Sequence, residues 1–313
     1  MNLEQLPTHI TQSTAWGKFK TKMGTAAVRA GEAQFTLHKI PLTPYHIGYC
    51  PKVDPTNIDW ERVKQAGEES RCVAIRFDCP NIIKKYRGTR EDGFQKHCVR
   101  APKSTFAKHT VFLDITPNED ELLSQMKAKT RYNTRYAQRH GVVVTEKTDR
   151  EGLQIFLKLQ RETATRQNFL IHPDKYYHQL FDTLQPHGMV HILVAEHQAQ
   201  PLAAYLLLGH QGVLYYPYGG SATAKRNLFP SNLLMWEAIL LGKRLNYQLM
   251  DMWGATTDEA DPWWGFTRFK LGYNGELVEF IDSYDLVINT PVYRAFNLTY
   301  ASFWKIVGLL RRG

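Results

Sequence analysis

The chain has 313 residues, 43% of them apolar, so it can form one large hydrophobic core or two ordinary ones and is neither disordered nor fibrous. Its formal net charge of +9 favours an anionic partner, which leaves nucleic acid, a nucleotide- or lipid-linked phosphate and an anionic membrane surface open. Four cysteines without a C-x-x-C pair argue against both a disulfide scaffold and a zinc site, so we predict reduced thiols and no metal.

Residues 1–20 lack the apolar stretch and cleavage site of a secretory signal, and no later stretch has the ~18 uninterrupted apolar residues of a membrane span. A cytoplasmic protein is therefore expected. The sequence also lacks the phosphate-binding loop of P-loop enzymes, the dinucleotide-binding glycine motif, the G-x-S-x-G nucleophile elbow and the H-E-x-x-H zinc motif. Nothing in it requires a bound cofactor.

The first third alternates short strand-like runs with a helical pattern over residues 59–70, which indicates βα units. The runs cover residues 26–28, 34–40, 46–50 and 73–77. Asn118 and Glu121 then have the spacing of a reciprocal helix cap, and this pattern predicts a single helix that ends near Gly141.

The remainder continues the same mixture of strands and helices. We predict a strand over residues 141–146, a helix over 149–168 and a three-stranded meander over 190–196, 201–209 and 212–218. A helix over residues 230–245 and a strand over 247–253 follow. Because this order is loosely repeated in both halves, we predict two similar α/β domains.

Basic side chains recur every four residues after the predicted cap, at Lys127, Arg131, Arg135 and Arg139. On a helix this spacing forms one slowly drifting stripe, which is suited to contact phosphates. An ordinary solvated helix face is the alternative.

Two aromatic segments are candidate binding elements. Residues 215–221 (Tyr-Tyr-Pro-Tyr-Gly-Gly-Ser) combine phenols with glycines that allow a ligand to approach the backbone closely, although an aromatic edge strand with a tight turn has the same composition. Residues 251–254 (Asp-Met-Trp-Gly) and 262–270 place Lys270 between aromatic runs. Lys270 therefore lies either in a pocket, where its charge acts strongly, or on the surface.

Taken together, these segments resemble the Fem family (the FemA, FemB and FemX group) of peptidoglycan bridge-forming aminoacyltransferases. The resemblance covers nearly the whole chain and is carried by residues 12–20, 76–78, 129–142, 162–177, 216–221, 251–254 and 269–272. It implies two acetyltransferase-like (GNAT-like) domains with a substrate cleft between them. We expect the first domain to comprise residues 1–140 plus about 285–313 and the second residues 141–284. The long coiled-coil arm of some members is absent.

The resemblance also implies contacts with the diphosphate of the precursor. Family members use a lysine that corresponds to Lys20, and Trp16 lies one helical turn before it on the same face. Other members have an arginine where this chain has His172, which is only partly charged near neutral pH, so Arg166 is a candidate substitute.

Further site residues follow from the same resemblance. Tyr176 and Tyr218 match substrate-contacting tyrosines, and we add Tyr216 and Arg76 as candidate substrate contacts. Lys270 matches a lysine near the reacting carbonyl and is expected to stabilise the oxyanion. Asp78 is a candidate proton acceptor, with a structural carboxylate paired to Arg76 as the equal alternative.

The expected function is transfer of an amino acid from aminoacyl-tRNA to an amine of the stem peptide in a nucleotide- or lipid-linked muramyl peptide. An aminoacyl ester is already activated, so no catalytic triad is needed. An N-acyltransferase that uses acyl-coenzyme A is one alternative, but residues 226–231 (Arg-Asn-Leu-Phe-Pro-Ser) lack its glycine-rich pyrophosphate loop. A non-catalytic tRNA-binding protein is another.

The basic, apolar residues 303–312 suggest either packing on the first domain or contact with the inner face of the membrane.

Overall fold

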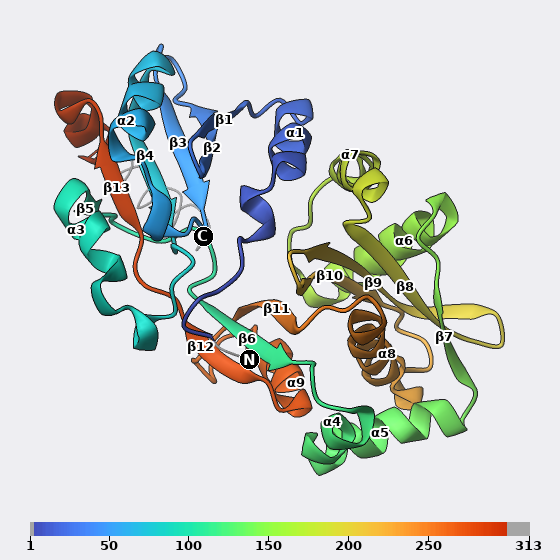
Figure 1. The fold of residues 1–313 in the computed structure, drawn as a ribbon. Coiled ribbons are helices and arrows are strands. Elements are labelled where there is room, and N and C mark those ends of the chain that lie inside the picture. Colours follow the sequence, from blue (N-terminus) through green and yellow to red (C-terminus); the bar gives the residue numbers. More distant parts are fainter. Residues whose placement is uncertain (1–2, 299–313) are drawn as a thin grey trace.

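Two β-sheets organise the chain in the computed structural model, which describes residues 3–298 (Figure 1). The first sheet has the strand order β1-β2-β3-β4-β13-β5, and the second has the order β12-β6-β11-β10-β9-β8-β7. Helices pack on both sheets, which confirms the prediction of an α/β protein with two domains.

The first sheet is antiparallel except for the parallel pair β3 and β4. Its strands are β1 (Ala27–Ala30), β2 (Ala33–Lys39), β3 (His46–Pro51), β4 (Cys72–Asp78), β5 (Val99–Arg100) and β13 (Tyr284–Val287). Three helices accompany it: α1 (Thr14–Lys22), α2 (Trp60–Glu69) and α3 (Asp92–His97).

The second sheet contains the predicted meander β8 (Val190–His197), β9 (Gln200–His210) and β10 (Val213–Ser221), flanked by β6 (His109–Asp114), β7 (Val142–Glu146), β11 (Leu249–Ala255) and β12 (Glu276–Glu279). Its helices are α4 (Glu119–Gln125), α5 (Ala128–Arg139), α6 (Arg150–Gln167), α7 (Asp174–Leu184), α8 (Pro230–Arg244) and α9 (Trp264–Lys270). β10 pairs in parallel with β11 only through Val213, Leu214 and Tyr215. Beyond Tyr215 the pairing of the two strands ends.

The change from one sheet to the other occurs earlier in the chain than the sequence suggested. We expected the first domain to extend to residue 140, but β6 pairs with β11 and β12 of the second sheet, and α5 packs on α8. The change therefore falls between Arg100 and His109. The expected return of the chain near residue 285 corresponds to β13, which pairs with β4 and β5.

Helix caps account for most of the correctly predicted boundaries. The side chain of Asn118 accepts a hydrogen bond from the Glu121 N–H while the carboxylate of Glu121 accepts one from the Asn118 N–H, as the spacing predicted. Asp149 caps the start of α6, and Asn168 ends it with a left-handed φ of 51°.

The single helix predicted from Asn118 to Gly141 is instead two helices, α4 and α5. Met126 and Lys127 between them are extended, and the Lys127 N–H donates to the carbonyl of Gly272, 2.9 Å away. Arg131 donates to the carbonyls of Leu123, Ser124 and Met126 at the end of α4. Gly272 is far from Lys127 in the sequence, so local sequence did not reveal the break.

Apolar packing joins the two domains. A separate core fills the first domain, whereas α6 and α7 cover one face of the second sheet and α5 and α8 cover the other. Ile10, Trp16 and Phe19 of the first domain belong to the core that α6 and α7 form. Ile10 and Phe19 are fully buried, and each contributes roughly 1.5–3 kcal/mol. α1 is thereby fixed against α7 (Figure 1).

Candidate active site

Aromatic side chains line the seam between α1 and α7. Phe19 and Tyr176 meet edge to face with ring centroids 4.9 Å apart, and the hydroxyl groups of Tyr176 and Tyr218 are 3.0 Å apart. Burial raises the pKa of Tyr176 to about 12, so its hydroxyl stays protonated at neutral pH. Tyr176 and Tyr218, predicted from separate segments, are thus in direct contact.

Lys20 lies on α1 beside this aromatic seam. It is half-buried, and partial desolvation lowers its pKa. Partial burial, and secondarily the charge of Lys20, lowers the pKa of His172 from the second domain and of His38 from β2. Lys20 therefore interacts electrostatically with both histidines. Lys20 carries a positive charge, and His38 and His172 become positive as the pH falls, so this group of side chains suits an anionic ligand. Trp16 has a supporting position, because its buried ring packs on Phe19 at 5.3 Å.

His172 occupies the position at which a second phosphate contact was in doubt. The residue is exposed, yet its ring stacks on Tyr176 with centroids 3.8 Å apart and an interplanar angle of 14°. Partial burial of the ring and the nearby charge of Lys20 both lower its pKa, so His172 is mainly neutral at pH 7. His38 was not predicted, since a lone histidine at a strand end gives no sequence signal.

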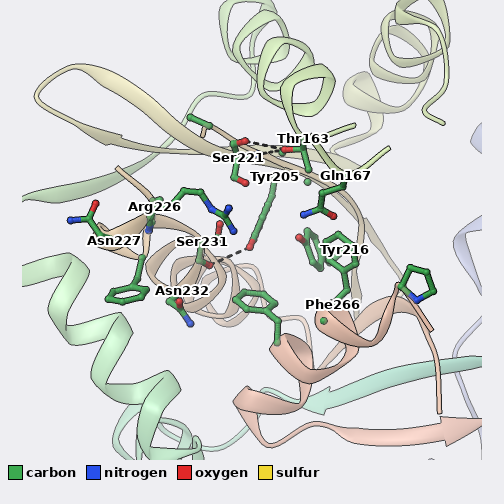
Figure 2. Close-up of a pocket in the computed structure, with 18 residues that line it drawn as sticks. Thr163, Gln167, Tyr205, Tyr216, Ser221, Arg226, Asn227, Ser231, Asn232 and Phe266 are labelled. Carbon is green, nitrogen blue, oxygen red and sulfur yellow. Dashed lines mark hydrogen bonds between the residues drawn. The ribbon is translucent and has the colours of Figure 1, made fainter. Parts of the chain in front are cut away.

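A pocket of about 840 Å³ opens in the second domain beside β10, between α6, the start of α8 and α9. Figure 2 shows its walls: Thr163 and Gln167 of α6, Ser221 of β10, Ser231 and Asn232 at the start of α8, and Phe266 of α9. The predicted tyrosine segment contributes Tyr216, whose ring lies 4.3 Å from that of Tyr205. Tyr216 therefore belongs to this pocket, whereas Tyr218 belongs to the seam with α7.

The pocket is suited to a ligand with an anionic and a planar part. It lies at the N-terminus of α8, where the helix dipole favours negative charge, and the exposed Arg226 lines it. Tyr205, Tyr216, Phe266 and Phe269 supply aromatic surface.

The glycines of residues 215–221 allow neighbouring elements to pack closely on β10, in addition to leaving room for a ligand. A side chain on Gly220 would place its Cβ 2.4 Å from the backbone nitrogen of Gln160, so α6 can approach β10 only because this residue is glycine. A Cβ on Gly219 would lie 2.6 Å from the hydroxyl of Tyr216.

Lys270 ends α9, the helix that also supplies Phe266 and Phe269 to the pocket. Its side chain is buried, so the alternative of a surface lysine was wrong. Its Nζ donates to the carbonyl oxygens of Gly254 at 2.5 Å and Trp253 at 3.4 Å. These backbone carbonyls hold the ammonium group. Burial lowers the pKa of Lys270 to about 8, although the charge of Asp251 opposes this effect.

Asp251 builds the loop that holds Lys270, and sequence reasoning gave it no role of its own. Its buried carboxylate accepts hydrogen bonds from the Trp253 N–H at 2.8 Å and the Thr110 hydroxyl at 2.5 Å. The pairing of β11 with β6 is irregular here, and Trp253 has a φ of 59°, which is unfavourable for a bulky residue. The fixed bulge directs the Trp253 and Gly254 carbonyls at Lys270.

Asp78 lies in the interior of the first domain. Its side chain has no exposed surface and accepts hydrogen bonds from the hydroxyls of Tyr49 and Ser283 and the N–H groups of Thr105 and Phe106, at 2.6–2.9 Å. With its lone pairs occupied, Asp78 is a structural carboxylate and does not act as a proton acceptor.

Arg76 does not pair with Asp78, contrary to the structural alternative we had considered. Its Nε and Nη2 instead donate to the two carboxylate oxygens of Asp285 in β13, each at 2.8 Å. This bidentate pair fixes β13 to β4. Arg76 is therefore a structural residue and not a substrate contact.

Arg166 is held within the second domain by hydrogen bonds to Ser221. Its Nη1 donates to the Ser221 carbonyl at 2.9 Å and its Nη2 to the Ser221 hydroxyl at 3.0 Å, which ties α6 to the end of β10. It therefore supports the pocket wall and does not substitute for the missing arginine at His172.

No group of three or more His, Cys, Asp or Glu side chains converges as a metal site within residues 3–298. In the same part of the chain no helix has the length and apolar character that a bilayer crossing requires. The segment 303–312, considered for membrane contact, lies outside the described residues.

Comparison with known proteins identifies the family. The FemAB family matches residues 85–197 and 191–301, which together exceed half of the chain. The chain belongs to the FemAB family. This membership confirms the resemblance inferred from the separate sequence segments.

Relatives and solved structures extend this finding over nearly the whole chain. The lipid II:glycine glycyltransferases of Staphylococcus epidermidis and Staphylococcus aureus are 21% and 22% identical to it, over 90% of this chain and 86% of theirs. The crystal structure of FemX is similar with a TM-score of 0.83 and 19% identity, covering 94% of this chain and 96% of that one. The similarity to FemX covers both sheets, so the predicted fold of two α/β domains is confirmed.

Proposed function

We propose that this protein is an aminoacyltransferase that moves an amino acid from aminoacyl-tRNA to an amine of a muramyl peptide precursor of peptidoglycan. Membership of the FemAB family and the glycyltransferase names of its relatives support the reaction class. The structural observation that carries the proposal is the position of Lys270. This residue ends α9, the helix that lines the pocket of the second domain, and the carbonyls of the loop built by Asp251 hold its ammonium group.

The acceptor side is the region around Lys20. Lys20 provides charge for a diphosphate, and His172 adds charge only as the pH falls. The hydroxyls of Tyr176 and Tyr218 provide polar contacts for the rest of the precursor. The relatives are named for lipid II, which supports a lipid-linked acceptor and a reaction at the inner face of the membrane.

The donor side is the pocket of the second domain. The terminal nucleotide of the tRNA has a planar base and a phosphate, and the pocket offers aromatic walls, Arg226 and the N-terminus of α8 for these two parts. The amino acid is esterified to the ribose of this nucleotide, so its carbonyl lies next to the part that the pocket binds.

The proposed reaction needs few chemical groups from the protein. The acceptor amine, once deprotonated, attacks the ester carbonyl, and the Lys270 ammonium stabilises the oxyanion of the tetrahedral intermediate. The ester C–O bond then breaks, the amide forms, and the proton lost by the amine passes through solvent to the ribose oxygen. No carboxylate is assigned as base, because Asp78 is enclosed by its four donors.

A donor comparison tests this assignment. Purified protein and precursor are mixed with aminoacyl-tRNA, with the deacylated tRNA plus free amino acid, or with acetyl-coenzyme A. We expect product only from aminoacyl-tRNA. Transfer from acetyl-coenzyme A would contradict the proposal, and so would salt-sensitive tRNA binding without any transfer.

A further inference from the structure

An exposed basic and aromatic face runs along α5 and its flanking residues. Residues 127–140 contain five lysines and arginines and no aspartate or glutamate. Arg131 is used internally, because it donates to the carbonyls at the end of α4. Lys127, Lys129, Arg135 and Arg139 are exposed, and none of them forms an ion pair with a carboxylate in residues 3–298. These four cations are therefore available to an external anion.

Aromatic rings alternate with the cations on this helix. Tyr132, Tyr136 and His140 recur at four-residue spacing, with ring centroids 5.9 Å and 3.7 Å apart, and the last two rings are stacked. Tyr132 is 55% exposed. Since residues three apart are neighbours on a helix, Arg135 lies beside Tyr132 and Arg139 beside Tyr136.

The α5 face adjoins the mouth of the donor pocket. Tyr136 packs edge to face on Phe229, with centroids 5.6 Å apart, and Phe229 lines the pocket together with Arg226 and Asn227. α5 lies alongside α8, whose N-terminus forms another wall of the pocket (Figure 1). A chain that leaves the pocket over Phe229 therefore meets the α5 face next.

We propose that the α5 face, consisting of Lys127, Lys129, Tyr132, Arg135, Tyr136, Arg139 and His140, binds the RNA strand adjacent to the nucleotide in the pocket. This inference rests on the proposed function. Phosphates pair with the exposed cations, and unstacked bases find planar partners in the tyrosine, histidine and guanidinium groups. An anionic bilayer is the weaker partner, because a membrane-binding helix inserts large aliphatic side chains and the exposed positions of α5 carry none.

The test compares Arg135→Gln/Arg139→Gln with the control Arg62→Gln/Lys64→Gln, which removes the same charge from exposed positions of α2 in the first domain. We expect the α5 variant to bind full-length aminoacyl-tRNA about tenfold or more weakly, and the salt dependence of binding to fall by roughly 1.4–1.8 in slope, as loss of two phosphate contacts requires. The control should keep the parental affinity and slope. Melting temperatures of both variants verify folding.

A second donor separates this inference from the proposed function. A minimal donor, the aminoacylated terminal dinucleotide, occupies the pocket without reaching far along α5, so kcat/KM for it should be unchanged in the α5 variant. Equal loss with both donors, or equal loss in the control, overturns the inference. Unchanged tRNA affinity together with lost binding to vesicles of anionic lipid overturns it in favour of a membrane. If the parent protein transfers from neither donor, the proposed function fails instead.

Discussion

Phe19 of α1 and Tyr176 of α7 pack edge to face with ring centroids 4.9 Å apart, which joins the two domains next to Lys20. Tyr176 also contacts the hydroxyl of Tyr218 and the ring of His172. Tyr176 therefore lies between the α1 segment that carries Lys20 and the side chains of His172 and Tyr218 in the second domain. A precursor bound here would contact both domains.

Lys20→Ala should raise the KM for the precursor and leave kcat nearly unchanged, because a phosphate contact made equally in ground and transition states contributes only to binding. The expected increase is roughly ten- to hundredfold, since a hydrogen bond to a charged group contributes about 1.5–3 kcal/mol. Steady-state kinetics at saturating aminoacyl-tRNA measure it. Lys18→Ala, an exposed neighbour on the same helix, is the control. An unchanged KM in Lys20→Ala would remove this residue from the site.

His172 makes precursor binding dependent on pH. Its pKa is lowered by partial burial and by Lys20, so it is neutral at pH 7.5 and becomes a cation only as the pH falls below its ordinary value of 6.5. The KM for the precursor should therefore decrease between pH 7.5 and 5.5. His172→Arg should lower the KM at pH 7.5 by about threefold to tenfold, as a permanent charged contact would. It should also flatten the pH dependence, with His38 and Lys20 accounting for any remaining slope. A parental pH profile in His172→Arg would show that His172 does not contact the anion.

Lys270→Met removes the ammonium group but keeps most of the side-chain volume. We expect single-turnover transfer to slow by ~10²- to 10³-fold, with both substrates still bound, as for loss of one oxyanion donor. In the parent, the charged form of Lys270 is lost as the pH rises through about 8, so the rate should decline above this pH. Asp251→Asn removes the charge that favours the ammonium form and should shift the decline to lower pH. If Lys270→Met transfers at close to the parental rate, the lysine has no part in the reaction.

Asp78→Asn should affect stability more than catalysis. Its carboxylate accepts from two hydroxyls and two backbone N–H groups, and an amide would place its own donors against some of them. Each mismatched buried group costs about 1–3 kcal/mol, so the melting temperature should fall. The folded fraction should retain most of its transfer rate. A large loss of rate in a variant of normal stability would restore the catalytic role that the structure argues against.

Local patterns predicted much of the fold but little of the long-range pairing. The cap formed by Asn118 and Glu121 and the alternating runs of β8 to β10 depend on residues near one another, and both were found as predicted. The partner of Arg76 is Asp285, 209 residues away, and nothing local indicates it. The placement of β6 in the second sheet likewise depends on pairing with β11 and β12.

The residues of the candidate site were likewise only partly predictable from the sequence. Lys20, Tyr176, Tyr218 and Lys270 were indicated by family resemblance. The structure places the first three around one seam and Lys270 at the end of α9, the helix whose Phe266 and Phe269 line the pocket. His38 lies in no motif that sequence reasoning recognised, and Arg226 and Asp251 lie in segments that it quoted without giving either residue a role in the site. Their roles emerge only from the electrostatic effect of Lys20, the opening beside β10 and the bulge at Trp253.

The most direct measurement is the mass of the acceptor after incubation of the purified protein with a labelled mixture of aminoacyl-tRNAs and with nucleotide-linked or lipid-linked muramyl pentapeptide. The account predicts that one of the two acceptors gains the mass of an aminoacyl residue, that the label comes from the tRNA ester, and that Lys270→Met yields far less product in the same time. If neither acceptor gains mass while the aminoacyl-tRNA remains intact, the protein does not catalyse the transfer assigned to it.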